Sequence, residues 1–332
     1  MKIVITGGRG FVGKALSKKF RNSEHIIHTI GRSSHFTKSD FPENCQHHCC
    51  DLANDPIPEA IFKGADLIFH IAAKAGMWGK YSDFYSSNVV ATRNILSACK
   101  KYHINKLIYT STPSVVFSTQ PIVNGTESLA YGNSGLSAYA ETKTIAEREI
   151  LEANESQKLQ TLALRPHLIW GDGDPHLLPR VINRHKIGKL RIVGEGRNKV
   201  DLTHVDNVVH AHFCAMESMV KNSSLGGKAY FIGQDEPVNL WDWLNEIFVM
   251  LDLPRLTKKI SYRKAYLLGF SLEKIWGILR LVGEPPMTRF VANQLAHDHW
   301  FSIQSAKKDL GYEPIRDMGN SLNKSLAWLK SL

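Results

Sequence analysis

The stretch that decides the fold is Lys2–Gly13, which reads KIVITGGRGFVG. Lys2–Thr6 predicts a buried strand, and a glycine-rich turn then opens a helix predicted over Phe11–Arg21. Glycines let the backbone turn tightly and approach a pyrophosphate, whose charge the N–H groups and dipole of a helix N-terminus favour. The segment therefore predicts a dinucleotide site. Its expected contacts are Gly7, Arg9, Gly10, Phe11, Val12 and Gly13.

Short apolar runs and helical patterns alternate through the first half of the chain. The further predicted strands are His25–Ile30, the region of Cys49, Leu67–Ile71, Lys106–Ser111 and Gln160–Arg165. The helices predicted between them include Phe84–Tyr102 and Ala138–Ala153. Such alternation predicts an α/β protein with a doubly wound parallel sheet and helices on both faces, the Rossmann fold.

The regular alternation of predicted strands and helices changes after Arg165. Helices are predicted over Val205–Met219 and Leu240–Leu251 and a strand over Tyr230–Ile232, and from Pro254 onward the sequence is basic and helical. We expect two domains with discontinuous boundaries. Residues 1–165 plus about 199–250 would bind the cofactor, and about 166–198 plus 251–332 would form a smaller, mostly helical substrate domain.

Composition narrows the class of protein. The chain has 332 residues, is 43% hydrophobic and 22% charged, and carries a formal net charge of +10. The basic residues are scattered and accompany no nucleic-acid-binding motif, so an anionic small molecule is a better expected partner than nucleic acid. Five cysteines without disulfide spacing, no signal-peptide pattern and no spanning apolar run predict a cytoplasmic protein. Cys45–Cys50 lacks a second ligand pair, and we expect no metal.

The end of the second predicted strand bears on the choice of dinucleotide. NAD sites place an acidic residue there for the ribose 2′-hydroxyl, but this strand ends in Arg32, with Arg9 as a second cation within reach. An added phosphate suits arginine, which predicts NADP(H). We also expect contacts from the ends of the third and fourth strands. These are Asp51, Leu52, Ala72, Ala73 and Lys74.

Tyr139–Lys143, reading YAETK, is the central catalytic motif. Residues four apart share one face of a helix, and an ammonium beside a phenol favours the phenolate, so Lys143 is expected to lower the pKa of Tyr139. Tyr139 would then be a general acid or base. Thr112, with Ser111 as second choice, ends the fifth predicted strand and could align the substrate oxygen. These hydroxyls could also merely cap the strand.

Taken together, TGGRGFVG (6–13), YTST (109–112) and YAETK (139–143) resemble the extended short-chain dehydrogenases/reductases. Asn88, Arg165-Pro166 and the segment Asp201–Asn207 match in order. TSTPSVVF (110–117) and RPHLIWGDGDPHLLP (165–179) resemble the 3β-hydroxysteroid and sterol-4-carboxylate dehydrogenase branch. The resemblance implies that Tyr139, Lys143, Asn88, Pro166 and His167 also contact the cofactor.

Several segments are similar to the bacterial 2-alkyl-3-oxoalkanoate reductases of long-chain olefin and β-lactone biosynthesis. They are AAKAGMWGKY (72–81), LRPHLIWGDGDPHLLPR (164–180), GEPPMTRF (283–290) and HWFS (299–302). This resemblance implies NADPH-dependent reduction of a long-chain 2-alkyl-3-oxo acid to the 3-hydroxy acid, a homodimer, and association with a β-lactone synthetase and a decarboxylase. Arg9 departs from the small residue that the family commonly has there.

A carboxylate substrate requires a cation, and the candidates are Lys74, His167, Arg180 and Arg289. Tyr262–Val282 is an apolar stretch interspersed with charges. It could wall an alkyl-chain tunnel, make peripheral contact with a membrane, dock a partner, or simply pack on the core.

Other functions remain open at this point. The main rival is a 3β-hydroxysteroid or sterol-4-carboxylate dehydrogenase working in the oxidative direction. A nucleotide-sugar dehydratase is disfavoured because Pro113-Ser114, rather than Asp-Glu, follow Thr112. A sugar epimerase is a weaker alternative. A non-catalytic NADP sensor on the same fold would not need to keep both Tyr139 and Lys143.

Overall fold

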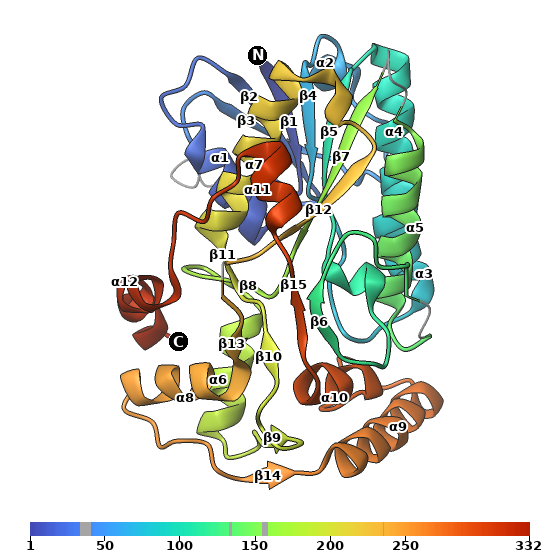
Figure 1. Cartoon of the computed structure of the whole chain (residues 1–332). Coiled ribbons are helices and arrows are strands. Elements are labelled where there is room, and N and C mark those ends of the chain that lie inside the picture. Colours follow the sequence, from blue (N-terminus) through green and yellow to red (C-terminus); the bar gives the residue numbers. More distant parts are fainter. Residues whose placement is uncertain (34–40, 133–134, 155–158, 235) are drawn as a thin grey trace.

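The computed structural model describes residues 1–33, 41–132, 135–154, 159–234 and 236–332. Its centre is a seven-stranded sheet in the order β12-β7-β5-β4-β1-β2-β3 (Figure 1). Every neighbouring pair of strands is parallel, which confirms the predicted Rossmann sheet. The strands are β1 (Lys2–Thr6), β2 (Ile26–Gly31), β3 (Cys45–Cys49), β4 (Leu67–His70), β5 (Lys106–Thr110), β7 (Gln160–Pro166) and β12 (Lys228–Ile232).

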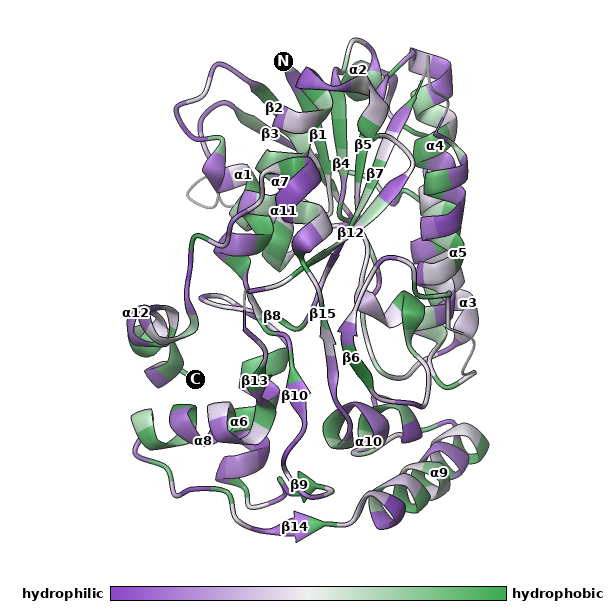
Figure 2. Cartoon of the chain, viewed as in Figure 1, coloured by the Kyte–Doolittle hydropathy of each residue, from purple (hydrophilic) through white to green (hydrophobic). Residues whose placement is uncertain are grey.

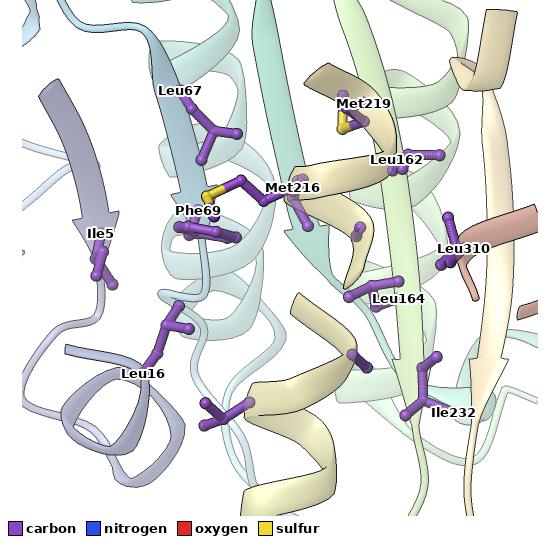
Figure 3. Packing of buried hydrophobic residues seen from close by; sticks show 14 of the residues in the cluster. Ile5, Leu16, Leu67, Phe69, Leu162, Leu164, Met216, Met219, Ile232 and Leu310 are labelled. Carbon is purple, nitrogen blue, oxygen red and sulfur yellow. The ribbon is translucent and has the colours of Figure 1, made fainter. Parts of the chain in front are cut away.

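Helices cover both faces of this sheet because alternate side chains of each strand point to opposite sides. Ile5 of β1 packs with Leu16 and Met216 on one face, under α1 (Phe11–Lys19), α7 (Val205–Lys221) and α11 (Gln304–Leu310) (Figure 3). Val4, the preceding residue, packs with Ile95 on the other face. That face is covered by α2 (Glu59–Phe62), α4 (Ala91–Tyr102) and α5 (Ala138–Glu152).

The helix predicted over Phe84–Tyr102 is not one regular helix. It begins earlier, as α3 (Tyr81–Tyr85), passes through the π-helical turn η2 (Ser86–Val90) and continues as α4. The widened turn contains Asn88, whose backbone oxygen accepts a hydrogen bond from the Thr92 hydroxyl at 2.6 Å. Single π-helical turns often occur at functional sites, and this one brings Asn88 to the crevice beside β4.

The other elements form a second cluster at the carboxyl ends of the central strands (Figure 1). Its core includes Trp170, Trp241 and Ala292, and hydrophobic stretches appear on its helices in Figure 2. A four-stranded sheet joins β13 (Val238–Asn239), β10 (Lys199–Val200), β15 (His299–Phe301) and β6 (Ile122–Gly125). Two-stranded pairs are β8 (Ile169–Trp170) with β11 (Thr203–His204), and β9 (Ile192–Val193) with β14 (Lys259–Ile260). The helices are α6 (Leu177–Lys186), α8 (Leu240–Met250), α9 (Tyr262–Leu279), α10 (Arg289–Ala296) and α12 (Met318–Lys330), with the 3-10 turn η3 (Pro113–Val116). The 3-10 turn η4 (Ser223–Leu225) lies instead between α7 and β12, where Leu225 packs in the core of the central sheet.

The predicted division into two domains stays a prediction, and two segments do not follow it. β6 lies within the first predicted unit but pairs with β15 of the second. Ile303 and Leu310, assigned to the second unit, pack in the same cluster as Ile5 of the central sheet. The chain therefore crosses between the two regions near residues 122 and 303 as well as after Arg165.

Candidate active site

The glycine loop between β1 and α1 leaves no room for a side chain at Gly7 or Gly13. Gly7 has φ +68°, and a Cβ there would lie 2.8 Å from the backbone nitrogen of Ala72. A Cβ at Gly13 would lie 2.2 Å from the Gly7 oxygen. Gly10 provides no side-chain cap for α1, and the first turn of this helix contains no acidic residue. An uncapped helix N-terminus behind a tight turn fits the diphosphate of a dinucleotide.

A buried chain of hydrogen bonds joins β1 to the π-helical turn. The Thr6 hydroxyl accepts from the backbone N–H groups of Ile71 and Ala72, at 3.1 Å each, and lies 2.8 Å from His70 Nδ1. His70 Nε2 lies 2.9 Å from the Thr92 hydroxyl, which donates to Asn88. Burial lowers the pKa of His70 to about 3, so the ring is neutral. The Thr6 hydroxyl therefore donates a hydrogen bond to His70 Nδ1, and His70 Nε2–H donates one to the Thr92 hydroxyl.

Asn88 then connects this chain to the helix that carries the catalytic motif. Its amide oxygen accepts from the backbone N–H of Lys74 at 2.7 Å, and its amide nitrogen donates to the Lys74 carbonyl at 3.1 Å and to the Thr142 hydroxyl at 3.0 Å. Thr142 donates to the carbonyl of Ala138 at 2.7 Å. Asn88 thus fixes the loop after β4 against the first turn of α5.

Tyr139 lies in that first turn, where Ser137 caps the helix by accepting from the backbone N–H of Ala140 at 3.2 Å. Burial raises the pKa of Tyr139 to about 12, although the nearby Thr112 side chain acts to lower it. The prediction that Lys143 lowers the pKa of Tyr139 is therefore wrong. The cost of burying a phenolate exceeds the stabilisation that the nearby groups provide.

Lys143 is almost fully buried and makes other contacts. Its ammonium donates to the backbone oxygen of Thr110 at 2.7 Å and lies 4.0 Å from the centre of the Tyr109 ring. Burial lowers the pKa of Lys143 to about 7, and Glu147, one turn further along α5, acts to raise it. Lys143 and Tyr139 nevertheless share one face of α5, as the spacing predicts.

The two candidate hydroxyls after β5 have different surroundings. Thr112 caps η3, accepting from the backbone N–H of Ser114 at 3.2 Å, and its side chain is near enough to Tyr139 to act on the pKa of the phenol. Thr112 therefore combines the capping role with a place beside the phenol. The Ser111 hydroxyl is buried and has no hydrogen-bond partner within the described part of the chain. A buried hydroxyl without a partner is costly, which fits a group that bonds to a ligand.

The proposed adenosine end of the crevice includes both candidate arginines. Arg9 donates to the Ser33 hydroxyl at 2.6 Å, so its guanidinium lies beside the end of β2. Arg32 is exposed at the same strand end. The Asp51 carboxylate accepts from the backbone N–H of Ala53 at 3.0 Å and so shapes the turn after β3, while Leu52 is buried. Ser34 falls outside the described residues.

The four candidate anchors for a substrate carboxylate are already engaged. Lys74 pairs with Asp83 at 3.0 Å, Arg180 pairs with Glu284, and Arg289 pairs with Glu273 at 2.7 Å. His167 follows Pro166 at the end of β7 and is buried, and its pKa is well below its usual value because of that burial. His167 is therefore neutral and provides no positive charge.

A cavity of about 330 Å³ opens beside Tyr139. Arg289 lines it, but Lys74 and Arg180 do not. Lys274 of α9 also lines it, and this lysine has no carboxylate partner among the residues that the structure describes. Two acidic side chains, Glu141 and Glu273, face the same cavity. Of the cations predicted for substrate binding, the structure brings only Arg289 to the tyrosine.

Sequence patterns missed several residues around the site. Glu147 and Arg165 form a buried ion pair, with Arg165 Nη2 donating to Glu147 Oε1 at 2.5 Å, and the Tyr131 hydroxyl donates to the same oxygen at 2.9 Å. Glu147 lies one further turn along the face of α5 that carries Tyr139 and Lys143, which is a signal that the spacing contained. His70 gave no such signal, because its partners Thr6 and Thr92 are far away in the sequence.

Residues 4–262 match the 3-beta hydroxysteroid dehydrogenase/isomerase family. The chain belongs to that family. It is 42% identical over 320 residues to the 2-alkyl-3-oxoalkanoate reductase of Stenotrophomonas maltophilia, covering 95% of each chain. It is 33% identical over 329 residues to the mouse (Mus musculus) sterol-4-alpha-carboxylate 3-dehydrogenase, decarboxylating, covering 98% of this chain and 90% of the mouse enzyme. This family member is an oxidoreductase of the extended short-chain dehydrogenase/reductase type, a class that uses a nicotinamide cofactor.

Solved structures agree on the fold. The chain matches UDP-glucuronic acid 4-epimerase from Bacillus cereus, solved in complex with NAD, with a TM-score of 0.77 at 21% identity, covering 100% of this chain and 99% of the epimerase. It matches a UDP-galactose 4-epimerase with a TM-score of 0.74 at 18% identity, covering 100% and 99% of the two chains. These likenesses show a shared extended Rossmann architecture.

Proposed function

We propose that this family member reduces a long-chain 2-alkyl-3-oxo acid to the 2-alkyl-3-hydroxy acid with NADPH. The observation that carries the proposal is the cavity that Tyr139 lines together with Lys274, which has no carboxylate partner among the described residues, and Arg289, which is paired with Glu273. A proton donor and a positive charge in one cavity suit a substrate with a ketone and a carboxylate. The reductase named from Stenotrophomonas maltophilia, similar over 95% of both chains, supports this choice.

The glycine loop would hold the diphosphate, and NADPH supplies the hydride when it is bound. Thr112 would hold the ketone oxygen beside Tyr139, whose hydroxyl donates its proton to that oxygen as C3 gains the hydride. Lys143, once charged, would favour the phenolate left on Tyr139. Ser111 offers a second hydroxyl whose hydrogen bond is unused. Asn88 holds the loop after β4 against the first turn of α5 through its hydrogen bonds to Lys74 and Thr142.

Substrate trials distinguish this proposal from its rival, oxidation of a 3β-hydroxysteroid or sterol-4-carboxylate. Each class is incubated in hydroxyl form with NADP⁺, which avoids the spontaneous decarboxylation of 3-oxo acids, and the reduced nicotinamide is followed by absorbance. We expect turnover of the 2-alkyl-3-hydroxy acid. Turnover of the sterols alone would replace the proposed substrate, and turnover of neither class would favour the cofactor-sensor function.

We further propose a preference for NADP(H) over NAD(H), based on Arg9 and Arg32 at the end of β2. Arg32→Ala combined with Arg9→Ala should raise KM for NADPH by about a hundredfold or more, since each of the two charge-assisted hydrogen bonds to a phosphate contributes roughly 1.5–3 kcal/mol. KM for NADH should change little. Steady-state kinetics with both cofactors measure the effect, and Arg21→Ala at the far end of α1 is the control. If KM rises by the same factor for NADPH and NADH, Arg9 and Arg32 do not select NADP(H).

For the substrate carboxylate we propose Arg289 and Lys274. Lys274→Ala and Arg289→Ala should each raise KM for the acid by about tenfold, with a smaller effect on its methyl ester, which lacks the charge. Lys264→Ala, an exposed lysine at the start of α9, provides the control. If the variants raise KM for the acid and for the ester by the same factor, neither residue binds the carboxylate. The earlier candidates Lys74 and Arg180 remain available as further variants.

Proposals about the cellular setting follow from the same resemblance. We propose a homodimer that works in the cytoplasm beside a β-lactone synthetase and a decarboxylase, which would consume the 3-hydroxy acid. All five cysteines are free, which suits a reducing compartment. Co-purification of the tagged enzymes and light scattering of the protein alone test these points.

A further inference from the structure

The helix α9 exposes an unusual amount of apolar surface. Eight large hydrophobic side chains between residues 267 and 282 are exposed, with exposed fractions from 42% to 100%. We call this set the α9 apolar face. It consists of Leu267, Leu268, Phe270, Ile275, Ile278 and Leu279 of α9, together with Leu281 and Val282, which follow the C-cap residue Arg280. Scattered single exposures are ordinary, but a cluster of this kind marks an interaction surface.

The same helix is attached to the protein along one narrow line. Its buried residues are Ala265, Gly269 and Glu273, spaced four apart. A Cβ at Gly269 would lie 2.6 Å from the backbone of Thr288, so α9 contacts the start of α10 closely there. Glu273 accepts hydrogen bonds from the backbone and the guanidinium of Arg289 at 2.7 Å each. Most residues of α9 are exposed, and Figure 1 shows this helix at the lower right, at the edge of the molecule beside α10.

Charge indicates what covers this face. Four basic residues on α9 and its end are exposed: Arg263, Lys264, Lys274 and Arg280. The single acidic residue of the helix, Glu273, is buried and paired. Exposed Leu, Ile and Phe with Lys and Arg, and without exposed acids, are typical of helices that lie in the surface of an anionic bilayer. The whole chain, at a formal net charge of +10, adds to that attraction.

We propose that the α9 apolar face docks on an anionic lipid bilayer, with the helix lying in the plane of the headgroups. None of the helices in the described part of the chain is long and apolar enough to cross a membrane. The family match ends at residue 262, where α9 begins, so this surface belongs to the part of the chain outside that match. The cavity beside Tyr139 is lined by Glu273, Lys274 and Arg289, so docking would place its α9 side at the lipid.

Vesicle co-sedimentation tests the proposal. The full chain is mixed with vesicles of phosphatidylcholine containing phosphatidylglycerol, and with phosphatidylcholine alone. We expect binding to the anionic vesicles that weakens at high salt, and a loss of about tenfold or more in Ile278→Glu/Val282→Glu. Both replaced side chains are at least 77% exposed, so the fold should tolerate the change. Ile26→Glu/Val220→Glu, which adds the same charge at exposed positions of β2 and α7, should bind as the parent does.

Three outcomes would overturn this assignment. The parent protein could fail to sediment with anionic vesicles, or Ile278→Glu/Val282→Glu could bind as well as the parent. A dimer seen by light scattering that Ile278→Glu/Val282→Glu dissociates, without vesicle binding, would assign the face to a second copy of the chain. Turnover of a short-chain, water-soluble substrate is measured in the same samples, and failure there counts against the proposed reaction and not against docking.

Discussion

Tyr139→Phe is expected to lower turnover by about a hundred- to ten-thousandfold, the usual contribution of a positioned general acid or base. The change removes the hydroxyl that lies near Thr112 and leaves the ring in place in the first turn of α5. Without it, the forming alkoxide loses the group that the proposed reaction assigns as its proton donor. The rate of nicotinamide oxidation at saturating substrate measures the effect.

Two controls separate chemistry from folding and binding. Tyr139→Phe should bind NADPH with nearly the affinity of the parent in a calorimetric titration and should unfold at nearly the same temperature. Tyr131→Phe removes a phenol of the same region that donates to Glu147 and not to Thr112, so it should keep most of the turnover. If Tyr139→Phe kept parental turnover, the assignment of Tyr139 as proton donor would be wrong.

Arg165→Leu is expected to destabilise the protein by about 3–5 kcal/mol, because it leaves a carboxylate buried without its partner. Arg165 is 4% exposed and Glu147 is 0% exposed, and the two side chains share three hydrogen bonds. The free energy of unfolding, measured by denaturant titration, gives the size of the loss.

The double variant Arg165→Met/Glu147→Leu is the matched test of that cause. Replacing both charges with apolar side chains removes the unpaired carboxylate and should recover most of the lost stability. Lys221→Ala, which breaks an exposed pair with Glu217, should cost much less. If the double variant were as unstable as Arg165→Leu, lost packing rather than a buried charge would explain the single variant.

Structural features that depend on a few neighbouring residues were predicted correctly from the sequence. KIVITGGRGFVG predicted β1, the turn and α1, because glycine spacing and strand periodicity act over a few residues. The shared face of Tyr139 and Lys143 also follows from helix spacing alone. The π-helical turn at Asn88 was missed, because the hydrogen bonds that hold Asn88 come from Lys74 and Thr142, which only the folded chain brings together.

The ion pairs and pKa values that the sequence did not predict depend on contacts between distant segments. Arg180 and Arg289 were both expected to be available to a carboxylate, but tertiary pairing places Glu284 and Glu273 beside them, and of the two arginines only Arg289 lines the cavity beside Tyr139. The pKa of Tyr139 was expected to fall because a lysine follows at the right spacing. Burial depends on the whole fold, and it raises that pKa to about 12 and lowers the pKa of Lys143 to about 7.

The most direct test of the proposed reaction follows a deuterium atom. The protein is incubated with NADP⁺ and a long-chain 2-alkyl-3-hydroxy acid that carries deuterium at C3, and the reduced nicotinamide is analysed by mass spectrometry. Hydride transfer between C3 and the cofactor predicts one deuterium in the reduced cofactor, with a 2-alkyl-3-oxo acid or its decarboxylated ketone as the other product. Reduced cofactor without deuterium, or none formed with this acid while a sterol substrate is oxidised, would contradict the proposed reaction.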